Sequence, residues 1–136
     1  MDVVTLQNSG LNEALGFRFD VLRADRVEMS WTVGPQHLQP HGIVHGGVYC
    51  AAVEASASAG AAAWFGERGQ VVGVANSTDF LRATREGRLV ATATPVHQGR
   101  SQQLWVVEIV RPDGKLAARG QVRVHNLPGK DWLGPQ

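Results

Sequence analysis

Apolar and polar residues alternate along two stretches near the start of the chain, residues 17–21 and 27–33. Alternation with a period of two is typical of a strand that buries one face and exposes the other. Ala24-Asp25 separates the two stretches and can form a tight turn, so the pattern predicts a β-hairpin. Ahead of this hairpin, the segment from Leu11 to Leu15 predicts one short helix.

The longest apolar run of the protein occupies residues 48–65 and contains a single ionisable carboxylate, Glu54. Alanines dominate the run, and apolar residues fall on every side of a helical wheel. This pattern predicts a helix that is buried on nearly all sides. We expect the helix to begin at Gly46 or Gly47 and to end near Phe65, just before a glycine.

Four further segments of strand-like composition follow the helix, and short turns rich in glycine, proline and polar residues separate them. Their order predicts an antiparallel meander in the second half of the chain. Two strands, a long helix and four more strands predict an α+β fold, in which a curved antiparallel sheet wraps one central helix. We expect a single domain over residues 1–126 and a poorly ordered C-terminal tail over residues 127–136. The four predicted strands are residues 71–81, 88–96, 102–111 and 115–125.

Charge and cysteine content exclude several classes of function. Thirteen Lys and Arg residues against twelve Asp and Glu residues give a formal net charge of +1, and the basic residues are scattered. This distribution argues against a nucleic-acid or membrane partner but leaves room for one anionic ligand. The single cysteine, Cys50, cannot form an intrachain disulfide, and the N-terminus lacks the basic and apolar regions of a secretory signal. We therefore expect a cytoplasmic protein.

One stretch of the chain resembles a known family when it is taken together with Glu54 on the expected helix. The stretch and Glu54 resemble the hotdog-fold acyl-CoA thioesterases, in the branch of the phenylacetate-pathway and hydroxybenzoyl-CoA thioesterases. The resemblance covers nearly the whole chain, because residues 97–101, 107–109 and 113–116 are similar to that family's closing hairpins. It implies a hotdog fold with CoA bound between protomers, and so a homodimer or a homotetramer. The stretch reads Leu38-Gln39-Pro40-His41-Gly42-Ile43-Val44-His45-Gly46-Gly47.

The family members that use glutamate have a recognisable spacing. A glutamine is followed by a glycine seven residues later, by the carboxylate eight residues after that, and by a Ser or Thr one helical turn further on. Gln39, Gly46, Glu54 and Ser58 have these spacings. Members that use aspartate carry an asparagine nearer to the His-Gly-Gly string, where this chain has none. The resemblance therefore implies the glutamate type, with these four residues in the catalytic roles.

Thioester hydrolysis requires stabilisation of charge on the carbonyl oxygen, and either a nucleophile or a base that activates water. The N–H groups of Gly46 and Gly47 at the start of the helix can polarise the oxygen, since the first N–H groups of a helix have no intrahelical acceptor. Glu54 is the candidate nucleophile or general base. Ser58 lies one turn later on the same face, where it can hold the carboxylate or a water.

Loop residues are candidates for orienting the reactants. Gln39 can hydrogen-bond the thioester carbonyl or the attacking water, and His45 can orient the loop or a ligand group. The likeness to the family also suggests five residues for the pantetheine or phosphate end of the substrate, and arginine suits phosphate because of its planar, permanently charged guanidinium. These five residues are Asn76, Ser77, Arg82, Arg100 and Ser101.

Three histidines, His37, His41 and His45, recur at every fourth residue, a spacing that would align them on a helix and suggest zinc. Pro40 and Gly42 oppose a continuous helix there, and no cysteine or carboxylate completes a ligand set. We therefore expect neither a metal nor another cofactor.

Two alternatives to a thioesterase stay open. A hotdog hydratase or dehydratase also binds acyl thioesters, but generally relies on a histidine together with an aspartate or glutamate. A non-catalytic protein of the same fold could bind acyl-CoA without turning it over. The sequence suits an aryl or a medium aliphatic acyl group alike, and it does not separate CoA thioesters from carrier-protein thioesters.

Overall fold

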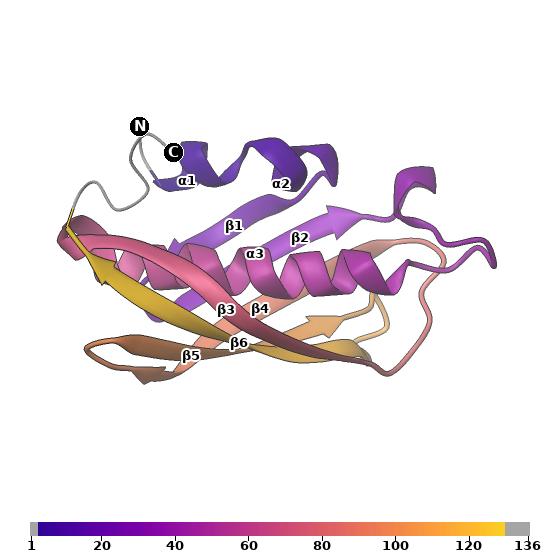
Figure 1. Cartoon of the computed structure of the whole chain (residues 1–136). Helices are drawn as coiled ribbons and strands as arrows, with labels where there is room; N and C mark the ends of the chain where they lie inside the picture. Colours follow the sequence, from indigo (N-terminus) through magenta and orange to yellow (C-terminus); the bar gives the residue numbers. More distant parts are fainter. Residues whose placement is uncertain (1–2, 130–136) are drawn as a thin grey trace.

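A computed structural model describes residues 3–129 of the chain as a curved antiparallel sheet with one long helix across its concave face (Figure 1). The α+β architecture, the first hairpin and the position of the long helix are as the sequence predicts. The helices are α1 (Val3–Gln7), α2 (Gly10–Ala14), η1 (Pro35–His37), α3 (Gly46–Phe65) and η2 (Gly66–Arg68). The strands are β1 (Arg18–Arg23), β2 (Arg26–Thr32), β3 (Gly69–Phe80), β4 (Arg88–Gln98), β5 (Gln102–Val110) and β6 (Leu116–Pro128).

The strand order corrects the predicted meander. The sheet runs β1-β2-β4-β5-β6-β3, so β3 does not pair with β4 and instead lies at the far edge beside β6. Residues 81–87, of which the sequence predicts only 84–87 as a short turn, cross the end of the sheet. Leu81 donates its N–H to the Ala117 carbonyl at one side, and Gly87 accepts from the Val33 N–H at the other. An extended segment of this length spans about 20 Å, more than the roughly 14 Å of three interstrand spacings.

The helix α3 contacts all six strands, and most of its surface is buried, as its composition predicts. Alanines allow the sheet to close around the helix, and Ala52, Ala57, Ala59 and Ala61 are fully buried. Residues at positions 50, 54, 58 and 62 form a half-buried stripe along one side. Glu54 lies on this stripe and is only partly buried, whereas Val53 and Ala55, which flank it in sequence, are buried. No helix within residues 3–129 is long and apolar enough to span a membrane.

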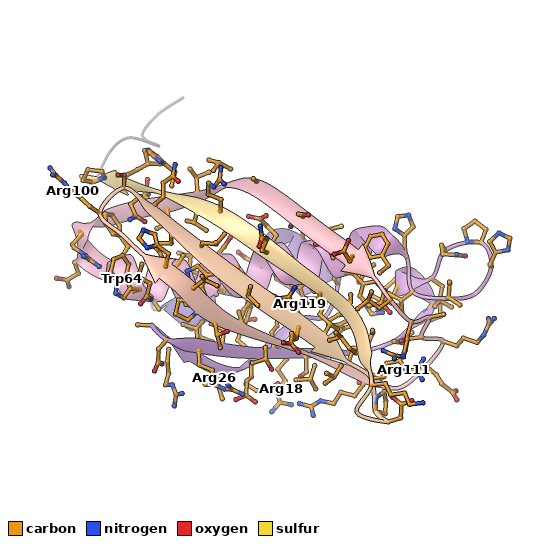
Figure 2. All side chains as sticks on the ribbon, turned by 90° about the horizontal axis from the view of Figure 1, so that it is seen from below. Arg18, Arg26, Trp64, Arg100, Arg111 and Arg119 are labelled. Atoms are coloured by element: carbon orange, nitrogen blue, oxygen red, sulfur yellow. The ribbon has the colours of Figure 1, made fainter. Side chains whose placement is uncertain are left out.

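The last strand is longer than the sequence predicts. Leu127 and Pro128 pair with Gln70 and Gly69 of β3, because β3 begins before the first apolar residue of its segment. These two residues therefore belong to the sheet and not to a tail, whereas residues 130–136 of the expected tail lie outside the described residues. Val122 and Val124 of β6 are buried, whereas Arg119 and Arg123 are exposed on the convex face, where Arg119 is seen in Figure 2.

Candidate active site

Glu54 meets two polar side chains, one for each carboxylate oxygen. Ser58, one turn further along α3, donates its hydroxyl to Oε2 at 3.2 Å. Asn76, on the neighbouring strand β3, donates its amide Nδ2 to Oε1 at 3.2 Å. The backbone of Gly73 also faces the carboxylate so closely that a methyl group at this position would overlap Oε2. The carboxylate is thus fixed between the helix and the edge strand, with one hydrogen-bond donor on each oxygen.

The two glycines at the start of α3 differ in what their N–H groups do. The Gly47 N–H donates to Nδ1 of His45, the N-cap residue, at 2.7 Å, so this donor is already occupied. Gly46 is the first residue of the helix, and its N–H has no intrahelical acceptor. A side chain at position 46 would also clash with Phe80, since a Cβ on Gly46 would lie 2.6 Å from the Phe80 ring. Of the two predicted donors, Gly46 is the one available to a ligand, and His45 acts as a helix cap.

Gln39 lies at the N-terminal end of α3 and not beside Glu54. It lines a cavity of about 290 Å³ together with Gly46, Tyr49 and Arg82, whereas Glu54 does not line it. The Gln39 side chain accepts a hydrogen bond from the His41 N–H, which folds the loop on itself. Eight residues of helix separate Gly46 from Glu54, or about 12 Å. The predicted catalytic residues therefore fall into two groups within one chain, Gln39 with Gly46 and Glu54 with Ser58.

The five residues suggested for the CoA end are not brought together. Asn76 contacts Glu54, and Ser77, its neighbour on β3, points to the opposite face of the sheet. Arg82 lies near the N-terminal end of α3 and donates to the Leu116 carbonyl at 2.9 Å. Arg100 and Ser101 lie at the opposite end of the molecule, as the position of Arg100 beside Trp64 shows (Figure 2). These two line a cavity of about 610 Å³ together with Trp64, Arg68 and His125.

The histidines of the loop have structural contacts. His37 is buried, and its ring bridges the Gly34 N–H at 2.9 Å and the Leu15 carbonyl at 2.7 Å. His41 is exposed and His45 caps α3. Among residues 3–129 no three His, Cys, Asp or Glu side chains gather in a way that could hold a metal ion. Cys50 is a free, half-buried thiol.

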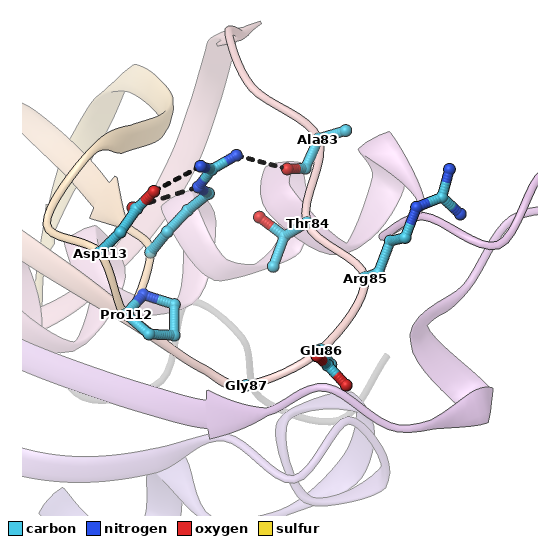
Figure 3. Close-up of a pocket in the computed structure, with 8 residues that line it drawn as sticks. Ala83, Thr84, Arg85, Glu86, Gly87, Pro112 and Asp113 are labelled. Atoms are coloured by element: carbon cyan, nitrogen blue, oxygen red, sulfur yellow. Dashed lines mark hydrogen bonds and ion pairs between the residues drawn. The ribbon is translucent and has the colours of Figure 1, made fainter.

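A further cavity of about 560 Å³ lies between residues 83–87 and 111–113 (Figure 3). Two of its charged side chains, Arg111 and Asp113, are paired with each other. Arg111 forms a bidentate ion pair with Asp113 and also donates to the Ala83 carbonyl at 2.8 Å. Hydrogen bonding by Arg111, and then by the Lys115 N–H, lowers the pKa of Asp113 to about 2. The guanidinium is thus held by the protein's own acceptors.

Sequence reasoning missed the role of strand β3 beside Glu54. The pairing of β3 with β6 shifts between Gly73 and Ala75, so Val74 is an extra residue that forms a β-bulge. The bulge changes which residues face the helix, and both Gly73 before it and Asn76 after it lie on the helix side. A regular period of two would put these residues on opposite faces. The polar run of residues 76–79, which interrupts an apolar segment, was the available signal.

Comparison with known proteins identifies the family. Residues 41–118 match the thioesterase superfamily. A Mycobacterium tuberculosis protein provisionally named an esterase is 48% identical over 119 residues, covering 85% of each chain. The 1,4-dihydroxy-2-naphthoyl-CoA hydrolase of Escherichia coli is 32% identical over 109 residues, covering 79% of each chain. The crystal structure of S. sahachiroi AziG is 53% identical and superposes with a TM-score of 0.87, covering 89% of this chain and 98% of that one. The chain therefore belongs to the thioesterase superfamily of hotdog-fold thioester hydrolases.

Proposed function

We propose that this protein hydrolyses an aryl- or acyl-CoA thioester to the free acid and CoA, with Glu54 as the nucleophile or general base. The observation that carries the proposal is the Glu54 carboxylate, which is half-buried on α3 and has a donor on each oxygen. A carboxylate fixed in this way is suited to attack a carbonyl carbon or to take a proton from water. The name of the Escherichia coli relative, a 1,4-dihydroxy-2-naphthoyl-CoA hydrolase, supports a CoA thioester and favours an aryl acid.

In the proposed reaction an oxygen, from Glu54 itself or from a water that Glu54 deprotonates, adds to the thioester carbonyl carbon. The carbon–sulfur bond then breaks, and CoA leaves as a thiolate that takes up a proton. If Glu54 attacks directly, water hydrolyses the resulting anhydride in a second step. The Gly46 N–H at the start of α3 would stabilise the negative charge that builds up on the carbonyl oxygen.

The distance between these groups supports a site shared by two chains. Gly46 and Glu54 lie about 12 Å apart on one rigid helix, whereas a base or nucleophile must come within about 3 Å of the reacting atoms. A carbonyl polarised at Gly46 is therefore out of reach of the same chain's Glu54. We infer that Gln39 and Gly46 of one protomer act together with Glu54 of the partner subunit.

Strand β3 supports a homodimer as the smallest assembly. Within residues 3–129 it pairs on one side only, with β6, and its outer edge leaves a row of backbone N–H and C=O groups. A long edge strand is usually covered, because its free groups otherwise pair with other chains. Pairing of two copies along β3 would cover this edge, and a homotetramer would contain two such dimers. Apolar side chains exposed on and just after β3 are Val72, Val74, Phe80 and Leu81.

Mixing two inactive variants tests the shared site. Gln39→Ala and Glu54→Ala should each be inactive alone, because each removes one half of every site. Unfolded together in equal amounts and refolded as a mixture, they should recover about a quarter of wild-type activity, since half of the dimers are mixed and each of these has one intact site. Two different affinity tags, one on each variant, would isolate the mixed dimers. If these mixed dimers are inactive, both residues act within one chain.

The CoA end of the substrate is assigned by charge. We propose that Arg82, Arg100, Ser77 and Ser101 contact the pantetheine or phosphate groups, the arginines because they can bind phosphate bidentately. Arg82 and Arg100 lie at opposite ends of one chain, so in this proposal they reach one CoA from different protomers. The cavity that contains Arg100 and Ser101 also contains Arg68, which adds positive charge. A cytoplasmic location, which we also propose, fits a substrate that carries CoA.

A panel of saturated, unsaturated and aryl thioesters, assayed with a thiol reagent, tests the function. We expect thiol release from CoA thioesters, with aryl-CoA favoured. Matched carrier-protein thioesters in the same panel distinguish the two carriers. Hydration of an unsaturated acyl-CoA with no thiol release would indicate a hydratase. Tight binding of acyl-CoA without turnover of any member of the panel would indicate a binding protein.

A further inference from the structure

We propose that Asn76 and Thr78 are positioning residues that hold the Glu54 carboxylate in its reactive orientation. This inference rests on the proposed function of Glu54 and adds two residues that the family spacing of Gln39, Gly46, Glu54 and Ser58 does not include. It also changes the role expected for Asn76, from a contact of CoA to a contact of the catalytic carboxylate.

The amide of Asn76 can take only one orientation in this setting. Its Nδ2 lies 3.2 Å from Glu54 Oε1 and 3.1 Å from the Cys50 carbonyl oxygen, both of which are acceptors. Turning the amide over would bring its own oxygen against these two oxygens. On the other side, Thr78 donates its hydroxyl to Asn76 Oδ1 at 2.7 Å. Thr78 therefore fixes the amide, and the amide fixes Glu54.

The hydrogen bond from Asn76 to the Cys50 carbonyl ties the same amide to the backbone of α3. Cys50 precedes Glu54 by one helical turn, so both acceptors lie on the same face of the helix. The amide is thereby fixed relative to the helix as well as to the carboxylate. Ser58 holds the second carboxylate oxygen from within α3. The side chain of Glu54 is then restrained from two directions, by its own helix and by the edge strand.

The shape of β3 makes this arrangement possible. The bulge at Val74 brings Asn76 and Thr78 to the helix side of the strand, on the same side as Gly73. Bulges occur next to active sites because they redirect a side chain. Gly73 leaves the space that the carboxylate occupies, since any side chain there would overlap it. Three residues of one strand thus combine to define a single place for the carboxylate.

The positioning role predicts a specific kinetic pattern. Asn76→Ala and Asn76→Asp should lower kcat by about 10- to 100-fold, because a displacement of a reacting group by about 1 Å can cost that much. KM should change by less than about two-fold, since substrate binding is untouched. A CoA contact would give the opposite pattern, a raised KM with kcat unchanged, and that result would overturn the proposal.

Thr78 provides a matched pair of variants. Thr78→Val keeps the shape but loses the hydroxyl, and it should lower kcat by roughly 2- to 10-fold, the value of one neutral hydrogen bond. Thr78→Ser keeps the hydroxyl and should keep a kcat near that of wild type. If the side chain mattered only for packing, the serine variant, which loses the methyl group, would be impaired more than the valine variant. Gln121→Ala, which removes an exposed amide from the convex face of the adjacent strand, is the control and should behave as wild type. Equal kcat values for Thr78→Val and Thr78→Ser would contradict the proposal.

Crystal structures of wild type and Asn76→Ala provide a readout that is independent of turnover. We expect the Glu54 carboxylate to leave its place beside Gly73 in the variant, while melting temperatures of the two proteins stay within a few degrees. An unchanged Glu54 orientation would overturn the positioning role even if activity fell. A wild-type protein that releases no thiol, together with a displaced Glu54 in the variant, would overturn the proposed function and leave the positioning role standing.

Discussion

Replacing Glu54 by alanine should abolish most thioester hydrolysis and leave the fold intact. The residue supplies the only carboxylate of α3, and its side chain lies on the half-buried stripe and not in the fully buried core. Its removal therefore leaves no cavity in the packed interior. Loss of a general base costs about 10²- to 10⁴-fold in rate, and loss of a nucleophile costs at least as much. We expect kcat to fall by that factor in a thiol-release assay.

Glu54→Gln is the matched control for size. It keeps the shape of the side chain and one of its two acceptor oxygens but cannot act as a base or as a carboxylate nucleophile, so its activity should fall as far as that of the alanine variant. Glu54→Asp keeps the carboxylate but withdraws it by one methylene, and it should retain more activity than Glu54→Gln. Circular dichroism and thermal melting of all three variants should match the wild type. Unaltered hydrolysis by Glu54→Ala would exclude Glu54 from the chemistry.

The largest expected effect on stability comes from Trp105. Its ring is completely buried, and its Nε1 donates to Gln103 Oε1 at 2.8 Å. Trp105→Ala should lower the free energy of unfolding by about 3–5 kcal/mol, the usual cost of deleting a buried aromatic ring. Gln103, which is also completely buried, would in addition lose the donor to its side-chain oxygen. Chemical denaturation would measure the change, which is a large fraction of the about 5–15 kcal/mol that stabilise a typical domain.

Gly60 packs directly against the Trp105 ring, so the two residues can be tested together. A Cβ built on Gly60 would lie 2.5 Å from the Trp105 ring, so in wild type Gly60→Ala should destabilise the protein by about 1–3 kcal/mol through overpacking. In the Trp105→Ala background the same change meets empty space, and alanine should instead stabilise the helix by up to about 1 kcal/mol. A double-mutant cycle measures this change of sign. Equal effects of Gly60→Ala in both backgrounds would show that the glycine is not needed to accommodate the ring.

Local pattern was sufficient to predict most elements of the fold. The hairpin of β1 and β2, the helix from Gly46 to Phe65 and the strands after it follow from the periods of apolar residues, because burial on one side or on all sides imposes those periods. The same apolar helix made Glu54 stand out, since a lone carboxylate among buried alanines requires an explanation. The length of β6 was missed, because its end depends on pairing with the start of β3.

The sequence alone determined the fold class, the central helix and the family spacing of Gln39, Gly46, Glu54 and Ser58. Those features depend on the order of residues along the chain. Only the tertiary structure decided which strand lies beside β6, which N–H at the start of α3 stays available, and how far Gln39 is from Glu54. It also decided, through the bulge at Val74, that Asn76 faces Glu54. These features depend on pairings between residues distant in sequence, and a shift of one residue in such a pairing reverses the face that every following side chain occupies.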